Sequence, residues 1–326
     1  MRNVWSKIGA GLVLGLTVII GLALLADIRA VATQVVTFRW QLAPAVLALT
    51  LFNYALRFLK WHYYIRQVGA TEIHWLDSLR IFVGGFPLAL SPGKLAEPLK
   101  AVWLQQRTGV PVARGIPVVA AERISDGLAV LLLSTLGVIA YPRYGAVFIA
   151  VLFALLAIVA ASQIRPLALR LLSLGERVPL ISRWSHHARE FYDGMYQVLG
   201  VRTTVVAVSL GMVSWLGEGL GFYVVLYGLG LPASLELAAA AVFVLSFSTI
   251  VGAISSLPGG LGAAEASIAG MLTLTQGIPA GLAATATLLI RFFTLWFGVV
   301  LGIVVLLASP RLLSLEPSGP PQEGRT

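Results

Sequence analysis

The chain has 326 residues, of which 58% are hydrophobic and 11% are charged, with a formal net charge of +9. Soluble domains carry roughly a quarter charged residues, so this composition excludes a soluble globular protein and indicates an all-α, polytopic membrane protein. The absence of cysteine excludes disulfides and thiolate chemistry. Because the arginines flank apolar segments, the positive charge indicates contact with anionic lipid rather than nucleic acid.

Six apolar stretches are long enough to cross a bilayer as helices, which takes about 20 residues each. We expect the first to be a retained helix rather than a cleaved signal peptide. Residues 163–197 predict an amphipathic surface segment, and residues 309–326 predict a disordered cytoplasmic tail after a single transmembrane domain over 1–308. The predicted spans are 8–26, 42–65, 115–140, 144–162, 203–229 and 280–308.

Two further apolar regions are interrupted. Residues 76–107 break at "FPLALSPGK", and residues 234–275 break at "SSLPGG". Proline removes a backbone donor and glycine relaxes the turn, and the freed backbone groups must lie inside protein or line a wet cavity. Each region therefore predicts a re-entrant hairpin of two half-helices. The predicted structural breaks are Pro92, Gly93, Pro258, Gly259 and Gly260.

The distribution of basic residues predicts the orientation in the membrane. If each hairpin returns to the side from which it entered, one side receives most of the loop arginines and both chain ends. The other side receives only Arg29, Arg39 and Arg143. The positive-inside rule then places both termini in the cytoplasm. Under this count the two hairpins enter the membrane from opposite sides.

A spacing pattern occurs twice. Glu97 precedes the turn Gly109-Val110-Pro111 by 12 residues and Arg123 by 26, and Glu265 stands in the same relation to Gly277-Ile278-Pro279 and Arg291. Opposed hairpins with a shared pattern predict two inverted repeats, about 76–140 and 234–308, with a binding site near the midplane.

The spacing also predicts two ion pairs. Each Gly-X-Pro turn lies midway between its glutamate and arginine, so two antiparallel helices would bring the pair together at one depth, roughly 15–20 Å from the turn. We therefore expect Glu97 to pair with Arg123 and Glu265 with Arg291, and we do not expect N-capping to explain either glutamate. Two interpretations stay open: the pairs fasten each hairpin to the next span, or they line a transport cavity.

The candidate cargo is a phosphate-bearing lipid head group. Helix N-termini near Lys94 and Gly260 would point into the membrane, and such ends suit phosphate. Lys94, Arg123 and Arg291 would add full positive charges. Glu122 and Asp126 would balance charge within their helix or contact a head-group amine.

Other signals are weaker. "LRFLKWHYYIR", with Arg57 and Lys60, reads as an aromatic and basic interface anchor with a possible second role in contacting anionic lipid. Glu218 is an intramembrane acid without a nameable role, and its "GEGLGF" context indicates small residues for helix packing rather than a nucleotide site. No metal site or cofactor is expected.

Three runs in this order resemble a known family: "SPGKLAEPLKAVWL", "AERISDGL" and "SLPGGLGAAEASI". They resemble the lysylphosphatidylglycerol synthase/flippase transmembrane family over roughly residues 10–310. The resemblance implies a multi-pass protein of the bacterial or archaeal cell (inner) membrane that moves lipids between leaflets. The family's soluble aminoacyl-transferase domain has no counterpart in this sequence, so lysyl transfer is not implied. Ile290 stands where symmetry with Glu122 would require an acid, which argues against a strictly symmetric mechanism.

The resulting hypothesis is a lipid flippase in which two inverted units rock around a head-group site. The alternatives are a membrane-embedded transferase acting on polyprenyl-phosphate sugars, and an accessory protein that localises a separate synthase. The expected partners are a membrane lipid, anionic or phosphate-bearing, and such a synthase.

Overall fold

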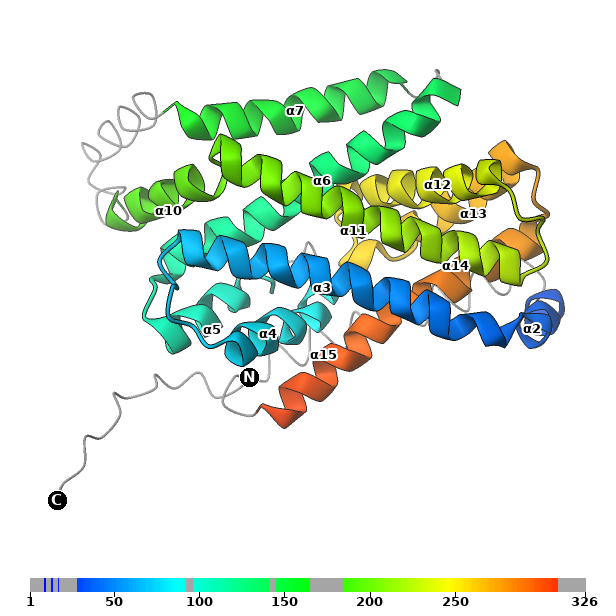
Figure 1. The fold of residues 1–326 in the computed structure, drawn as a ribbon, viewed down its shortest axis with the longest axis horizontal. Helices are drawn as coiled ribbons and strands as arrows, with labels where there is room; N and C mark the ends of the chain where they lie inside the picture. Colours follow the sequence, from blue (N-terminus) through cyan, green and yellow to red (C-terminus); the bar gives the residue numbers. More distant parts are fainter. Residues whose placement is uncertain are drawn as a thin grey trace.

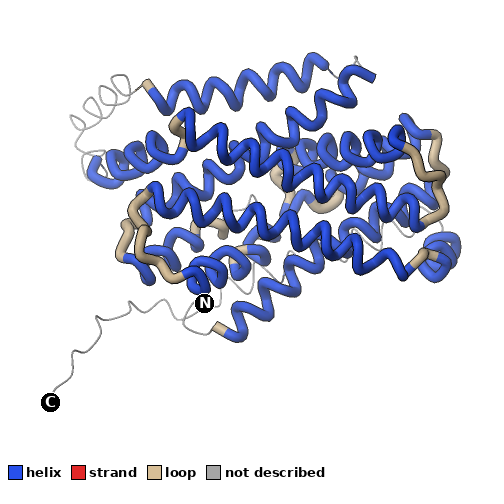
Figure 2. The backbone as a smooth tube through the Cα atoms, in the orientation of Figure 1, coloured by secondary structure: helices blue, strands red, loops and turns tan. Residues whose placement is uncertain are grey.

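The structure, a computed structural model, describes residues 28–91, 96–140, 145–164 and 185–309 and the single positions 9, 13 and 17. Every regular element within these residues is a helix (Figure 2), as the composition predicts. Several sequence predictions lie outside the described residues: most of the first span, the break at Pro92 and Gly93 with the neighbouring Lys94, much of the surface segment, and the tail from residue 310.

The first half of the fold is a set of helices that we call the first unit, α3 to α6. Helix α3 begins with a proline at its first turn, and α4 is capped by the His74 ring, which accepts a hydrogen bond from the Leu76 amide at 3.3 Å. Helix α5 ends at Gly109, whose left-handed φ of 74° glycine adopts without strain. The first unit comprises α3 (Ala43–Gln67), α4 (Trp75–Gly84), α5 (Leu99–Thr108) and α6 (Val112–Ala140), preceded by α2 (Ile28–Thr37).

The second unit, α11 to α15, follows two connecting helices among the residues that the structure describes. Ser234 caps α12 by accepting a hydrogen bond from the Leu237 amide at 3.0 Å, and α13 ends at Gly277 with a φ of 64°. The connecting helices are α7 (Gly145–Gln163) and α10 (Ser185–Val198). The second unit comprises α11 (Val201–Gly228), α12 (Leu235–Ile254), α13 (Ala263–Gln276), α14 (Ala280–Arg291) and α15 (Phe297–Ala308), with a π-helical segment (Phe292–Trp296) between the last two.

The helix boundaries of the two units recur at the spacing found in the sequence. Glu97 and Glu265 are 168 positions apart in the sequence. The first and last residues of α6 likewise precede those of the continuous helix α14–α15 by 168 positions. The end of α5 precedes the end of α13 by the same number, and a left-handed glycine follows each. In Figure 1, α3 and α11 lie side by side and run in opposite directions. Helices α6 and α15 also run in opposite directions but do not lie next to each other. The helical hairpins expected at the two Gly-X-Pro turns are therefore present. Inversion of the units across a membrane stays a prediction.

The two interrupted regions meet inside the protein. In the first, Phe86–Leu90 forms a 3-10 turn, and Ser91 Oγ accepts a hydrogen bond from the Ala96 amide at 2.9 Å. In the second, Gly259 and Gly260 have left-handed φ values of 61° and 68°. A Cβ atom on Gly259 would lie 2.9 Å from Leu90 Cδ2, so the two breaks are in direct contact.

One predicted half-helix is longer than expected. Four of the described helical segments are long and apolar enough to cross a membrane, and α12 is among them. At 1.5 Å per residue its 20 residues extend about 30 Å, the thickness of a bilayer core. The second region thus contains one full-length helix and one shorter helix. The four segments are Trp40–Gln67, Val201–Gly228, Leu235–Ile254 and Ala280–Ala308.

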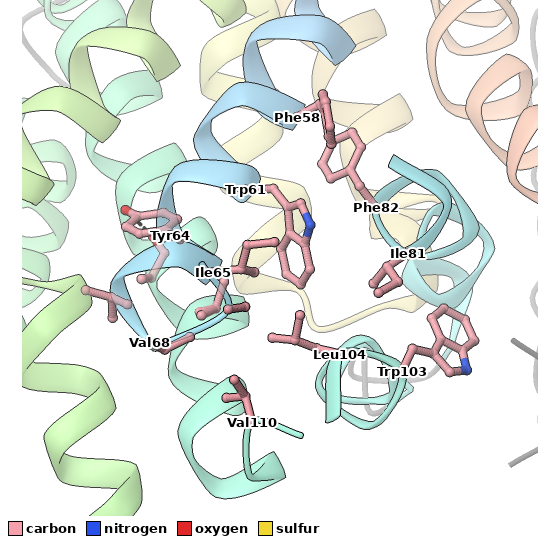
Figure 3. Packing of buried hydrophobic residues seen from close by; sticks show 14 of the residues in the cluster. Phe58, Trp61, Tyr64, Ile65, Val68, Ile81, Phe82, Trp103, Leu104 and Val110 are labelled. Carbon is pink, nitrogen blue, oxygen red and sulfur yellow. Dashed lines mark hydrogen bonds between the residues drawn. The ribbon is translucent and has the colours of Figure 1, made fainter. Parts of the chain in front are cut away.

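The buried apolar side chains form two large clusters, each drawn mainly from one unit. In the first, Trp61, Tyr64 and Ile65 of α3 are fully buried and lie opposite Phe82 of α4 and Leu104 of α5 (Figure 3). In the second, side chains of α11, α12, α13 and α14 form one cluster. Large apolar side chains also stay exposed on the outer faces of α3, α11 and α15, as expected for helices that face lipid.

The "GEGLGF" glycines mark the close contact between α11 and its neighbours, as expected. A Cβ atom on Gly219 would lie 2.9 Å from the Cα atom of Val242 on α12, whereas one on Gly221 would meet Leu49 at an ordinary 3.6 Å. Gly219→Ala should therefore destabilise the protein by about 1–3 kcal/mol through overpacking. Gly221→Ala, the matched control, should be neutral or slightly stabilising. Thermal unfolding in detergent checks both, and equal midpoints would contradict the close backbone contact.

Candidate functional site

A cavity of about 500 Å³ lies between the two units, and we call it the central cavity. Side chains from α3, α5 and α6 of the first unit and from α11, α12 and α14 of the second border it, together with residues of both breaks. Of the predicted site residues, Glu97, Glu122, Arg123, Asp126 and Arg291 line this cavity. Charged groups from both units therefore face one shared cavity.

The predicted ion pair of the first unit is present. Arg123 on α6 donates from Nη2 to Glu97 Oε1 at 2.6 Å and from Nε to Glu97 Oε2 at 2.9 Å. This bidentate geometry fixes the orientation of the guanidinium as well as its charge. Glu97 lies two residues before α5 begins, and its side chain is 5% exposed.

The predicted ion pair of the second unit is also present but is built differently. Arg291 Nε donates to Glu265 Oε1 at 2.6 Å, and Arg291 Nη2 donates to the Gly259 carbonyl at 3.0 Å. The Gly262 amide donates to Glu265 Oε2 at 2.7 Å. The expectation that N-capping would not involve Glu265 was therefore wrong, because α13 begins at Ala263 and places this glutamate in its first turn. The pair thus joins α13, α14 and the break.

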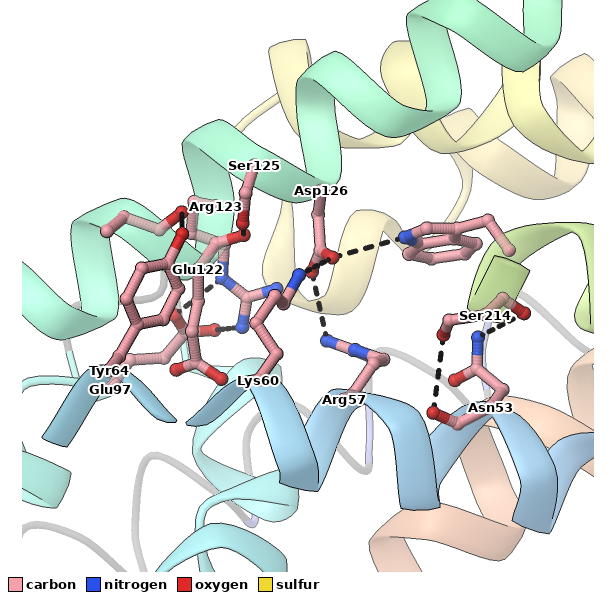
Figure 4. Close-up of polar contacts among 12 residues, drawn as sticks. Asn53, Arg57, Lys60, Tyr64, Glu97, Glu122, Arg123, Ser125, Asp126 and Ser214 are labelled. Atoms are coloured by element: carbon pink, nitrogen blue, oxygen red, sulfur yellow. Dashed lines mark hydrogen bonds and ion pairs between the residues drawn. The ribbon is translucent and has the colours of Figure 1, made fainter. Parts of the chain in front are cut away.

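Two further acids of α6 pair with lysines from other helices. Lys100 Nζ of α5 lies 2.6 Å from Glu122 Oε2 and 3.9 Å from the centre of the Trp61 ring. Asp126 binds Lys60 and, at 3.4 Å, Arg57, both on α3 (Figure 4). The Trp215 indole of α11 also donates to Asp126 at 3.2 Å. Glu122 and Asp126 therefore do not simply balance charge within α6, because their partners come from α3, α5 and α11.

The buried lysines were not recognised in the sequence. The interpretation of Arg57 and Lys60 as an interface anchor was wrong, since Lys60 is 1% exposed and Arg57 borders the cavity. Their spacing of three residues places them on one face of α3, and Lys100 likewise follows Glu97 by three. A search for basic residues at helical spacing inside apolar segments would have found Arg57 and Lys60.

The arginines and the acids differ in their exposure. The side chain of Arg123 is 40% exposed and those of Arg57 and Arg291 are 18% and 16% exposed, and all three border the cavity. The carboxylates that bind them are at most 9% exposed. The cavity wall therefore presents guanidinium groups that are more exposed than the carboxylates that bind them.

Glu218 of α11 is the exception among the acids of the cavity. It borders the cavity at 9% exposure and forms no hydrogen bond or ion pair with any residue that the structure describes. The ranges described contain no cluster of three or more side chains suited to a metal ion. Lys94, the third predicted cationic site residue, lies outside those ranges.

Comparison with known proteins agrees with this architecture. A family model described as "Lysylphosphatidylglycerol synthase TM region" matches residues 12–302. A UPF0104 membrane protein of Methanothermobacter thermautotrophicus is 26% identical over 285 residues, which cover 81% of this chain and 82% of that protein. No solved structure matches the chain. Since the family model covers most of its length, the chain belongs to the family of lysylphosphatidylglycerol synthase transmembrane regions.

Proposed function

We propose that this protein is a lipid flippase that moves a phosphate-bearing head group between the leaflets of a bacterial or archaeal cell membrane. The observation that carries the proposal is the exposure of Arg57, Arg123 and Arg291 in the central cavity. A guanidinium presents paired N–H donors that match the oxygens of a phosphate. The membrane segments and the family name support a lipid rather than a soluble anion as the cargo.

The cavity suits a head group rather than a whole lipid. Ligand pockets for small molecules have volumes of about 300–1,000 Å³, and the central cavity falls in this range at about 500 Å³. A charged group that entered the hydrocarbon alone would cost several kcal/mol, roughly 3 or more. In the proposed mechanism the head group crosses among the arginines while the acyl or prenyl chains stay in the bilayer.

The movement that we propose is a rocking of two inverted units around the cavity. The opposed directions of α3 and α11 (Figure 1) and the recurrence of the helix boundaries support the inversion. The direct contact between Leu90 and Gly259 would place the two breaks at the point about which the units move. In this arrangement both termini lie in the cytoplasm.

Transport in liposomes tests the proposal. Purified protein is reconstituted with fluorescent phosphatidylglycerol, and a membrane-impermeant quencher reports the leaflet in which the lipid lies. The wild type should increase transbilayer movement over protein-free liposomes, and Arg123→Gln with Arg291→Gln should reduce that increase about tenfold or more, because charge-assisted hydrogen bonds are lost. The exposed Arg80→Gln is the matched control. A wild type no faster than protein-free liposomes would refute the proposal.

The word "synthase" in the family description supports a second candidate, an accessory or transferase role in lipid-linked synthesis. Co-purification of a soluble enzyme with a protein that moves no lipid would favour the accessory role. A product that forms only when purified protein receives a lipid-linked sugar donor would favour the transferase.

A further inference from the structure

Glu218 holds a position in the cavity that the ion pairs leave unexplained. The other acids around the cavity bind cations of neighbouring helices at 2.6–3.4 Å or closer, whereas Glu218 has no such contact among the described residues. Its side chain is nine-tenths buried and borders the cavity. A carboxylate in this setting has water or a cavity ligand as its remaining partner.

The groups around Glu218 come from several helices. Arg57 of α3, Asp126 of α6 and Arg291 of α14 interact with Glu218 electrostatically. Tyr54 of α3 is close enough to interact with it electrostatically as well. Helix α12 contributes Ser248 and Thr249 to the cavity, and neither titrates near neutral pH. The favourable field at Glu218 therefore comes from Arg57 and Arg291, two of the three arginines that the proposed cargo would contact.

An anionic head group would change this field. Bound to Arg57 and Arg291, a phosphate offsets the positive charge that stabilises an ionised Glu218 and adds a negative charge beside it. A nearby like charge favours the neutral form of a carboxyl group. The other acids would weaken an ion pair on gaining a proton. Glu218 has no cation of its own among the described residues, so its protonation breaks the fewest existing contacts.

We propose that Glu218 is a proton site, and that binding of an anionic head group in the central cavity is coupled to the uptake of one proton by this carboxylate. This inference rests on the proposed function, because it needs a phosphate-bearing head group in the cavity. The bound state then carries the head group and the proton together, so a transmembrane proton gradient would bias the direction of lipid movement.

Calorimetry counts the proton directly. Dioctanoyl phosphatidylglycerol is titrated into the full-length protein in detergent, in two phosphate-free buffers that differ in ionisation enthalpy. The wild type should take up about one proton per lipid bound, and its affinity should fall with rising pH by up to about tenfold per unit. Glu218→Gln, which imitates the protonated acid, should bind with about zero uptake and a flat pH profile. Glu236→Gln, at an exposed position of α12, should behave as the wild type.

The outcomes separate this inference from the proposed function. Wild-type binding without proton uptake would overturn the role of Glu218 and leave the flippase proposal standing, and this result needs no variant that folds. A wild type that binds no phosphatidylglycerol at any pH would reject both. A preference for phosphatidylethanolamine that Glu218→Gln abolishes would also overturn the proton site, since Glu218 would then hold the head-group ammonium.

Discussion

Asp126→Ala is expected to destabilise the protein by about 3–5 kcal/mol, the cost of leaving a buried ion without its partner. Asp126 is the carboxylate that binds both Arg57 and Lys60, and Lys60 is almost completely buried. The indole of Trp215 would lose its hydrogen-bond acceptor as well. Reversible unfolding in mixed micelles measures the free energy, and thermal unfolding in detergent gives the ranking.

Two comparisons identify the cause of that loss. Asp77→Ala, the matched control, removes the partner of the half-exposed Arg80 and should cost less than about 1 kcal/mol. Lys60→Met combined with Asp126→Ala should be more stable than Asp126→Ala alone, because the buried ammonium is then gone. If Asp126→Ala unfolds like the wild type, the cluster does not hold α3 to α6.

Exchanging the charges of the first ion pair separates its two interpretations. Glu97→Arg with Arg123→Glu keeps opposite charges together but replaces the cavity-facing guanidinium by a carboxylate. If the pair acts in transport, the exchange should lower phosphatidylglycerol movement in liposomes about tenfold to a hundredfold, as expected from losing charged hydrogen bonds and adding repulsion. If it only fastens the hairpin, transport should persist.

The exchanged protein needs evidence that it folds. Its elution in size-exclusion chromatography and its thermal midpoint should stay close to those of the wild type. Arg123→Lys provides a milder variant that keeps the charge and loses the bidentate geometry, and it should retain part of the transport. Full transport by the folded exchange variant would contradict a direct role of Arg123 toward the cargo.

Features set by local regularity could be predicted from the sequence. The Gly-X-Pro turns end one helix and start the next, and the regular helical rise then brings residues 26 positions apart together, so the pairs of Arg123 and Arg291 followed from spacing. The length of α12 could not be predicted in this way. Its residues are mostly apolar from end to end, and such a composition does not distinguish a half-helix from a full one.

Features set by tertiary packing were missed. Lys60 and Lys100 are buried because acids of α6 reach them from another helix, and a single sequence does not show which helices become neighbours. The capping role of Glu265 depends on Gly262, whose φ of 87° starts α13 later than the proline-glycine break suggests. The unpartnered state of Glu218 likewise becomes visible only when the partners of the other acids are known.

Native mass spectrometry of the purified protein tests most directly whether the central cavity binds a phosphate-bearing head group. The wild type, released from mild detergent, should carry a phosphate-bearing lipid, and Arg123→Gln with Arg291→Gln should carry markedly less of it than Arg80→Gln prepared in parallel. Equal occupancy of the same lipid in all three proteins, or co-purification of lipids without phosphate, would contradict the assignment of the cavity.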